Sequence, residues 1–172
     1  EIDERADFVG VIMNQGQVFE QHVLRYLEQV TDVKTIWTGD YAGRYDLSTS
    51  EQTFEAMTHG VPIIYQATLR DAESKTYGSP DFLFRSDIVN DLFSNTLSVE
   101  ESTRAAPDLP GAKWHYVVVD SKFANLDLLS KTGELGNAES SRAYKVQVHL
   151  YNRMLARLQG YNPPQAFLLG RG

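Results

Sequence analysis

The chain has 172 residues, of which 42% are hydrophobic and 23% charged, so it can fill the core of one globular domain but is too short for a second. It contains no cysteine, which excludes disulfides, thiol catalysis, zinc–thiolate sites and iron–sulfur clusters, and we recognise no signal peptide or bilayer-spanning apolar run. The formal net charge of −7 argues against nucleic-acid binding by overall attraction, although a local basic patch beside bound cations can still provide it.

The lack of cysteine fits an intracellular protein, and the lack of an apolar run long enough to span a bilayer argues against a membrane partner. The chain opens on Glu1 rather than Met, and it ends on Gly172 just after an apolar strand-like run. We therefore expect residues 1–172 to form a single domain that is a fragment of a longer protein.

The first predicted element is a helix from Phe8 to Val30, in which apolar residues recur at three-to-four spacing. Glu20 lies one turn after Gly16 on the same helix face. A short strand, Val33 to Thr38, follows this helix.

The next predicted helix has Thr49 or Ser50 as its N-cap and ends before Gly60. After it, residues Val61 to Leu69 (VPIIYQATL) read as a strand. Gln66 is the odd polar residue of this strand and could face a site. One face of the strand would carry Ile63, Tyr65, Ala67 and Leu69.

A turn from Asp71 to Gly78 and a strand from Pro80 to Arg85 complete a predicted hairpin, with Asp81 at the start of the second strand. We expect Asn95 to Gly111 to be a solvated loop. The composition of Tyr116 to Val119 is that of a buried central strand.

Asp120 and Lys122 follow that buried strand and, at a period of two, point to the same face. An isolated pair of this kind is typical of a structural ion pair, so its neighbours must decide its role. A loop from Asn125 to Glu139 comes next.

The last predicted helix is capped by Ser140 or Ser141 and stopped by Gly160, and a short strand from Ala166 to Leu169 ends the pattern. Its apolar stripe consists of Tyr144, Val148, Tyr151, Leu155 and Leu158. The order of elements predicts the α/β class, with a central mixed sheet flanked by helices.

Three acidic side chains stand on separate elements that we expect to be rigid: Glu20, Asp81 and Asp120. Mg²⁺ prefers oxygen ligands and keeps several waters, so two or three carboxylates and a backbone carbonyl suit it. A cation bound there would activate water and stabilise charge on a phosphate, and Lys122 would offset further negative charge. The pattern favours a metal-dependent phosphodiesterase.

Ser79-Pro80-Asp81 followed by Asp120-Ser121-Lys122 resembles the signature of the PD-(D/E)xK nuclease superfamily. The element order resembles the αβββαβ core of its restriction-endonuclease-like fold. Gln147 and Tyr151 in the last helix resemble the Q-x-x-x-Y motif of the RecB-like branch, which includes the CRISPR-associated and RecB-type exonucleases.

Two features depart from part of that branch. Many members carry a histidine where this chain has Glu20, and some carry a four-cysteine iron–sulfur cluster, which this chain cannot form. His22 cannot share an ion with Glu20, because two residues turn a helix by about 200°. We expect His22, His59, His115 and His149 to have surface or capping roles.

The resemblance implies a nuclease that hydrolyses DNA, as a single strand or at an end, with RNA as an open alternative. Mg²⁺ or Mn²⁺ would be held by Glu20, Asp81, Asp120 and the backbone carbonyl of Ser121, with Lys122 assisting catalysis. Gln147 and Tyr151 would bind the strand, although Tyr151 can also be a core residue of its helix.

Two alternatives stay open at this point. The domain can be an inactive, nuclease-derived module that binds DNA or serves in assembly, within a larger helicase or repair protein. The second alternative is a phosphoesterase of a different acidic-site family. Such an enzyme would need His or Asp ligands spaced more densely than they are in this chain.

Overall fold

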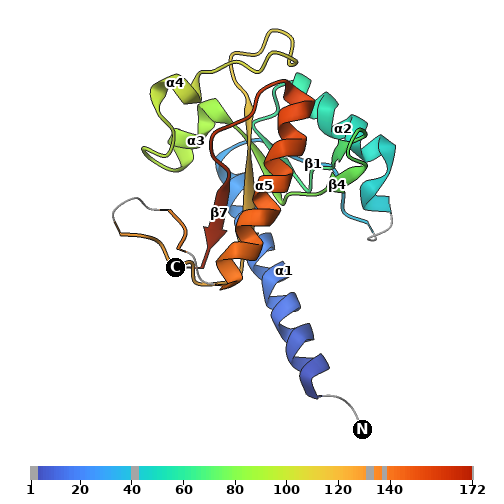
Figure 1. Cartoon of the computed structure of the whole chain (residues 1–172), viewed down its shortest axis with the longest axis vertical. Helices are drawn as coiled ribbons and strands as arrows, with labels where there is room; N and C mark the ends of the chain where they lie inside the picture. Colours follow the sequence, from blue (N-terminus) through green and yellow to red (C-terminus); the bar gives the residue numbers. More distant parts are fainter. Residues whose placement is uncertain (1–3, 40–42, 131–133, 137–138, 172) are drawn as a thin grey trace.

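A five-stranded mixed sheet forms the centre of the computed structural model, which describes residues 4–39, 43–130, 134–136 and 139–171 (Figure 1). The strand order is β1-β2-β5-β6-β7. Neighbouring strands β2, β5 and β6 are antiparallel, whereas β1 runs parallel to β2 and β7 parallel to β6. The strands are β1 (Val33–Thr35), β2 (Ile63–Tyr65), β5 (Phe82–Arg85), β6 (Tyr116–Lys122) and β7 (Phe167–Gly170).

Helices cover both faces of this sheet, and the predicted α/β class is confirmed. The helices are α1 (Glu4–Val30), η1 (Gly43–Tyr45), α2 (Leu47–Thr58), α3 (Ser86–Leu92), α4 (Val99–Ser102) and α5 (Glu139–Gln159). Figure 1 shows α5 in front of the sheet and the first half of α1 projecting from the body. Within the described residues, no helix has both the length and the apolar character needed to cross a bilayer.

Alternation along β5 and β6 separates two apolar clusters. Leu83 and Val118 pack with Met57 of α2 and Leu155 of α5 on one face of the sheet. The residues next to them in sequence turn to the other face: Phe82, Phe84, Val117 and Val119. They pack there with Leu24 and Leu27 of α1 and Val89 of α3. Burial on both faces explains why β6 reads as a continuous apolar run.

The ends of the helices differ in part from the prediction. α1 begins at Glu4 rather than Phe8. The N-cap of α2 is Asp46, and Thr49 lies inside the helix, where its hydroxyl donates to the Asp46 carbonyl at 2.7 Å. The predicted stops are confirmed, since Gly60 and Gly160 follow the helices with φ of 69° and 70°, a conformation that favours glycine.

The other predicted helix caps were wrong as well. Ser50 belongs to α2, and Ser140 and Ser141 belong to α5, which begins at Glu139. Caps depend on local backbone angles, which the apolar spacing does not specify.

The predicted strand from Val61 to Leu69 is divided at Gln66, whose φ is 52°. β2 ends at Tyr65, and β3 (Leu69–Asp71) pairs with β4 (Thr76–Gly78) in a separate two-stranded sheet. One residue in the left-handed conformation reverses the alternation, so Ala67 and Leu69 pack with Ile64 and not with Ile63 and Tyr65. The pairing of β2 with β5 is antiparallel, as predicted.

The predicted solvated loop from Asn95 to Gly111 was wrong in part. It contains the four-residue helix α4, and Leu97, Ala106 and Leu109 are buried in the two clusters. These isolated apolar residues have no helical or strand period, so only the tertiary packing reveals their burial.

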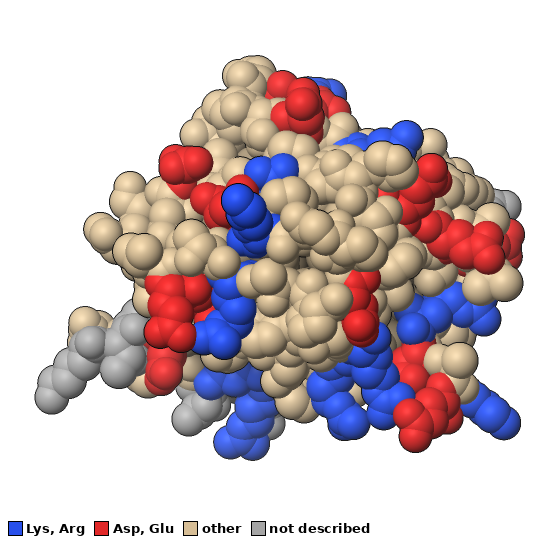
Figure 2. Space-filling model, turned by 90° about the horizontal axis from the view of Figure 1, so that it is seen from above, with Lys and Arg blue, Asp and Glu red and all other residues tan. Residues whose placement is uncertain are grey.

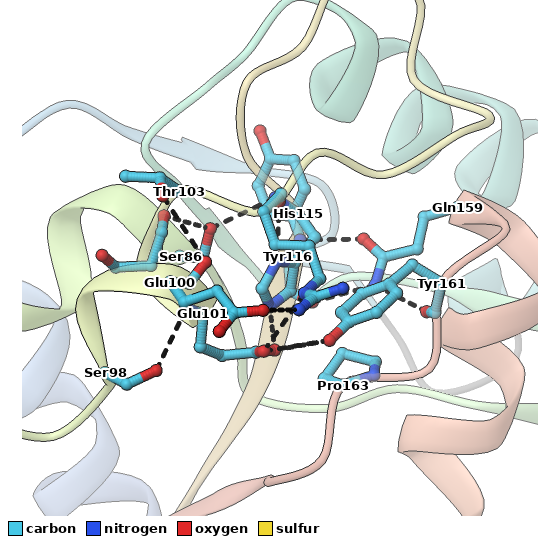
Figure 3. Close-up of polar contacts among 12 residues, drawn as sticks. Ser86, Ser98, Glu100, Glu101, Thr103, His115, Tyr116, Gln159, Tyr161 and Pro163 are labelled. Carbon is cyan, nitrogen blue, oxygen red and sulfur yellow. Dashed lines mark hydrogen bonds and ion pairs between the residues drawn. The ribbon is translucent and has the colours of Figure 1, made fainter.

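The prediction of a surface or capping role was also wrong for His115, whose side chain is fully buried just before β6 (Figure 3). Its Nδ1 lies 3.0 Å from the Arg104 carbonyl and its Nε2 3.3 Å from Glu101 Oε1. Tyr161 donates its hydroxyl to the same Glu101 carboxylate at 2.8 Å. This polar cluster links α4 to the segment between α5 and β7.

A second buried side chain, Gln159, completes the backbone pairing at the start of β6 (Figure 3). Its Oε1 accepts from the Tyr116 amide at 2.8 Å, and its Nε2 donates to the Tyr116 carbonyl at 3.0 Å. β7 pairs only with Val119 to Lys122, so the amide of Gln159 takes the place of a neighbouring strand at Tyr116.

We predict that His115 makes folding sensitive to acid. Burial lowers the pKa of His115. The hydrogen bond to the Arg104 carbonyl and the charge of Glu101 raise it again, but only in part. Below about pH 6.5 the unfolded chain takes up a proton that the folded chain does not. The free energy of unfolding should therefore decrease as the pH is lowered, by up to about 1.4 kcal/mol per pH unit. His115→Gln keeps a donor for Arg104 and removes the titration, and urea unfolding between about pH 5 and 7 should then show a shallower dependence.

His149→Gln, on the exposed face of α5, is the matched control and should retain the dependence of the unmodified protein. Equal pH slopes for the two variants would contradict the prediction.

Candidate functional site

Asp81 and Asp120 meet at the end of the central strand pair. The register that pairs Phe82 with Val119 places Asp81 opposite Asp120. The Asp81 amide donates to Asp120 Oδ1 at 3.4 Å, and Asp81 Oδ2 accepts from the Ser121 amide and hydroxyl at 2.8 and 2.7 Å. Two carboxylates are thus fixed side by side on a rigid pair of strands.

Lys122 follows Asp120 by two residues and points to the same face, as predicted from the strand period. Its Nζ forms an ion pair with Asp120 Oδ2 and lies 5.4 Å from the centre of the Tyr144 ring. Burial works to lower the pKa of Lys122, but the charge and hydrogen bond of Asp120 outweigh it and the pKa is raised. Lys122 is therefore an ammonium at neutral pH.

The Asp81 carboxyl resists ionisation in this setting. Burial, followed by the charges of Asp120 and Glu20, raises its pKa to about 7, against the two hydrogen bonds from Ser121. Neighbouring carboxylates cannot all ionise cheaply without a cation. The site thus carries negative charge that is only partly compensated.

Glu20 approaches from α1 and is held by side chains of β2 and the residue after it. Glu20 Oε1 accepts from the Tyr65 hydroxyl at 2.7 Å and from Gln66 Nε2, and Gln66 Oε1 accepts in turn from Arg44 Nη2. Glu20 is near enough to raise the pKa of Asp81. Nevertheless, no three acidic or histidine side chains among the described residues are grouped closely enough to hold a metal as they stand.

Gln147 and Tyr151 lie on one face of α5, and Gln147 Nε2 donates to the Tyr151 hydroxyl at 2.9 Å. The Tyr151 ring packs so closely on β4 that a Cβ atom at Gly78 would lie 2.5 Å from it. Burial raises the pKa of Tyr151, Gln147 lowers it, and the charge of Asp120 raises it further. Tyr151 is therefore partly buried against the core and also lies within electrostatic reach of the carboxylates.

Gln66 is a larger part of the site than its sequence indicates. Besides contacting Glu20, its backbone amide donates to the Asp81 carbonyl at 2.7 Å. The one sequence signal for this role of Gln66 is that it is a lone polar residue in an apolar predicted strand. Arg44, which contacts Gln66, follows a short loop and carries no recognisable pattern.

The donor set fits a hard divalent cation. Asp81 and Asp120 provide carboxylate oxygens, and Ser121, which follows Asp120 in the chain, donates to Asp81 Oδ2. Asp120 Oδ2 is buried, and among the described residues its one partner is the Lys122 ammonium.

Comparison with models of protein families, with curated proteins and with solved structures yields no match to this chain. The chemistry of the site therefore has to be argued from its own geometry.

We predict that Asp81→Asn stabilises the metal-free protein at alkaline pH. Because the pKa of Asp81 rises from 3.8 in the unfolded chain to about 7 in the folded one, ionisation costs stability progressively over that range. Asparagine keeps an oxygen for Ser121 without the charge. In a chelator at about pH 8, the free energy of unfolding should rise by on the order of 2 kcal/mol, and the gain should vanish near pH 4.

Urea unfolding measures this difference, with Asp91→Asn on the exposed surface of α3 as the control. An Asp81→Asn protein that is less stable than the unmodified protein at about pH 8 would contradict the pKa direction.

Proposed function

We propose that this chain is a Mg²⁺- or Mn²⁺-dependent nuclease domain of the RecB-like PD-(D/E)xK type, which hydrolyses phosphodiester bonds of DNA as a single strand or at ends. The observation that carries the proposal is the pair Asp81 and Asp120, held side by side with the Lys122 ammonium on Asp120. This arrangement combines oxygen donors for a cation with a positive charge for a phosphate.

The order of elements supports the same proposal. α1, then β2, β5 and β6 as antiparallel neighbours, then α5, then β7 parallel to β6, form the αβββαβ sequence expected of a restriction-endonuclease-like core. β1, the β3–β4 hairpin and α2 to α4 are additions to that sequence.

In the proposed mechanism, Asp81, Asp120, Glu20 and the Ser121 carbonyl would hold the cation. A bound divalent cation supplies an activated water and neutralises phosphate charge. Lys122 is protonated, so it acts as a cation beside the scissile phosphate and does not serve as a general base. The ion pair with Asp120 keeps the Lys122 ammonium in place before the substrate arrives.

The surface charge is consistent with binding that depends on a cation. Figure 2 shows acidic and basic side chains interspersed over the face seen from above, with basic ones more numerous along its lower edge. With a net charge of −7, overall attraction to DNA is weak. Substrate affinity would then depend on the ion at the carboxylates and on local contacts.

One observation favours the second candidate, a nuclease-derived module that binds DNA or serves in assembly without cutting. Glu20 is engaged by Tyr65 and Gln66, and no ready group of three ligands exists among the described side chains. An active enzyme needs Glu20 or water to complete the coordination of the ion.

We expect the domain to cleave labelled single-stranded DNA in Mn²⁺, and Asp120→Asn and Lys122→Gln each to lower the rate by about 10²- to 10³-fold. Asparagine removes a charged ligand, and glutamine removes the ammonium beside the phosphate. Circular dichroism would verify that both variants fold. Unchanged cleavage by both variants would sink the assignment of the site.

Calorimetric titration with Mn²⁺ separates an active site from an inert scaffold. The unmodified domain should bind the ion, with an affinity that increases with pH as Asp81 ionises, and Asp81→Asn should weaken binding by at least about 10-fold. Asp91→Asn should bind as the unmodified protein does. No binding to the unmodified domain would favour the inactive module.

A further inference from the structure

The helix α5 carries a charge opposite to that of the rest of the chain. It contains four of the 16 Lys and Arg residues but one of the 23 Asp and Glu residues, so its net charge is +3 and that of the remaining residues is −10. A helix face that serves only for solvation usually mixes charges of both signs. The excess of positive charge on α5 therefore indicates an anionic partner.

The basic residues follow one side of α5. Arg142, Lys145, His149 and Arg153 succeed one another at spacings of three or four residues, and all four are exposed; we call them the basic track. Arg142 and Arg153 are about three turns apart and return to nearly the same side of the helix. Neither of these arginines, nor His149, has a hydrogen-bond or ion-pair partner among the described residues. Their N–H donors are available to a ligand.

Arg157 continues the same spacing but is already engaged. Its Nη1 lies 3.0 Å from Asp71 Oδ1 and also forms an ion pair with Glu73. The free positive charge therefore ends at Arg153.

A pocket of about 580 Å³ lies at this end of the basic track, between α5 and the segment that leads to β7. We call it the α5 pocket. His149 and Arg153 line it together with Asn152, Asn162 and Pro163, and none of the described residues that line it is acidic. Imidazole, guanidinium and amide groups thus converge on one hollow that no carboxylate neutralises.

Asn152 supplies the α5 pocket with an unused acceptor. Only 9% of the residue is exposed, and its Nδ2 donates to the Pro163 carbonyl at 2.8 Å, which fixes the orientation of the amide. Asn152 Oδ1 is buried and accepts no hydrogen bond within the part of the chain that the structure describes. A ligand with an N–H group could satisfy it.

The other end of the basic track lies near the carboxylate site. Arg142 belongs to the turn of α5 that carries Tyr144, and the centre of the Tyr144 ring lies 5.4 Å from Lys122 Nζ. A strand bound at Lys122 can therefore continue along α5 toward the α5 pocket.

We propose that the basic track binds the DNA strand that extends from the carboxylate site, and that the α5 pocket holds one of its nucleotides. Arg142 and Arg153 contact separate phosphates, and an N–H of the base in the pocket donates to Asn152 Oδ1. The identity of the anion as DNA rests on the proposed function. A nucleotide combines the phosphate that a guanidinium binds with the base donor that the amide oxygen lacks.

The salt dependence of binding tests the basic track in a chelator, where the carboxylates hold no cation. Anisotropy of a labelled twelve-residue thymidine oligonucleotide gives the affinity, whose logarithm should fall with the logarithm of salt concentration by about 0.7 for each phosphate bound. Arg142→Gln and Arg153→Gln should each weaken binding by about 3- to 10-fold and reduce that slope by about 0.7.

Arg25→Gln is the matched control, because Arg25 is an exposed arginine of α1, which packs on the other face of the sheet. It should change neither the affinity nor the slope. If Arg142→Gln and Arg153→Gln bind as Arg25→Gln does, the basic track is overturned. Circular dichroism would verify that all three variants fold.

Methylation of thymine at N3 tests the α5 pocket, because it removes the only N–H donor of the base and leaves the phosphates unchanged. The unmodified domain should bind the methylated oligonucleotide about 3- to 10-fold more weakly than the thymidine oligonucleotide. Asn152→Ala should reduce this difference. Equal affinity of the unmodified domain for the two oligonucleotides would overturn the placement of a nucleotide in the pocket, as would a difference that Asn152→Ala leaves unchanged.

Cleavage kinetics distinguish this inference from the proposed function. Arg153→Gln should raise KM and leave kcat within about 2-fold of the unmodified value, unlike Asp120→Asn. If the unmodified domain cleaves while Arg142→Gln and Arg153→Gln bind and cleave as Arg25→Gln does, the basic track fails and the nuclease stands. If nothing cleaves while both variants still lower the affinity and the salt slope, the nuclease fails and the basic track stands.

Discussion

The constraint on which the structure depends is the burial of the Asp120 carboxylate at the end of a central strand. Only 1% of this residue is exposed, and a second carboxylate, Asp81, lies beside it. Burying like charges is costly unless each is paired or hydrogen-bonded. Lys122 and the donors of Ser121 provide that compensation in part, and the raised pKa of Asp81 shows what is left uncompensated.

The rest of the fold keeps this costly arrangement in register. A shift of β6 by one residue would turn Asp120 and Lys122 to the other face of the sheet. Gln159 fixes the start of β6 through the backbone of Tyr116, and four residues of β7 pair with its end. Apolar clusters on both faces hold the strand between these two points.

The residues around the carboxylates divide between two sides. α5 brings Tyr144 and Tyr151 toward Lys122 and Asp120, whereas α1 and the break after β2 bring Glu20 and Gln66. The Asp81 carboxylate lies within electrostatic reach of Glu20 on one side and of Tyr151 on the other.

The sequence by itself determined the α/β class, the burial of β6 and the placement of Asp120 and Lys122 on one face, because these depend on local periodicity. Only the tertiary structure decided the division of the Val61–Leu69 segment, the burial of His115 and the contact of Gln66 with Glu20. The physical reason is the same for all three. Each depends on contacts between residues far apart in the chain, such as Glu20 with Gln66, which no local pattern of side chains encodes.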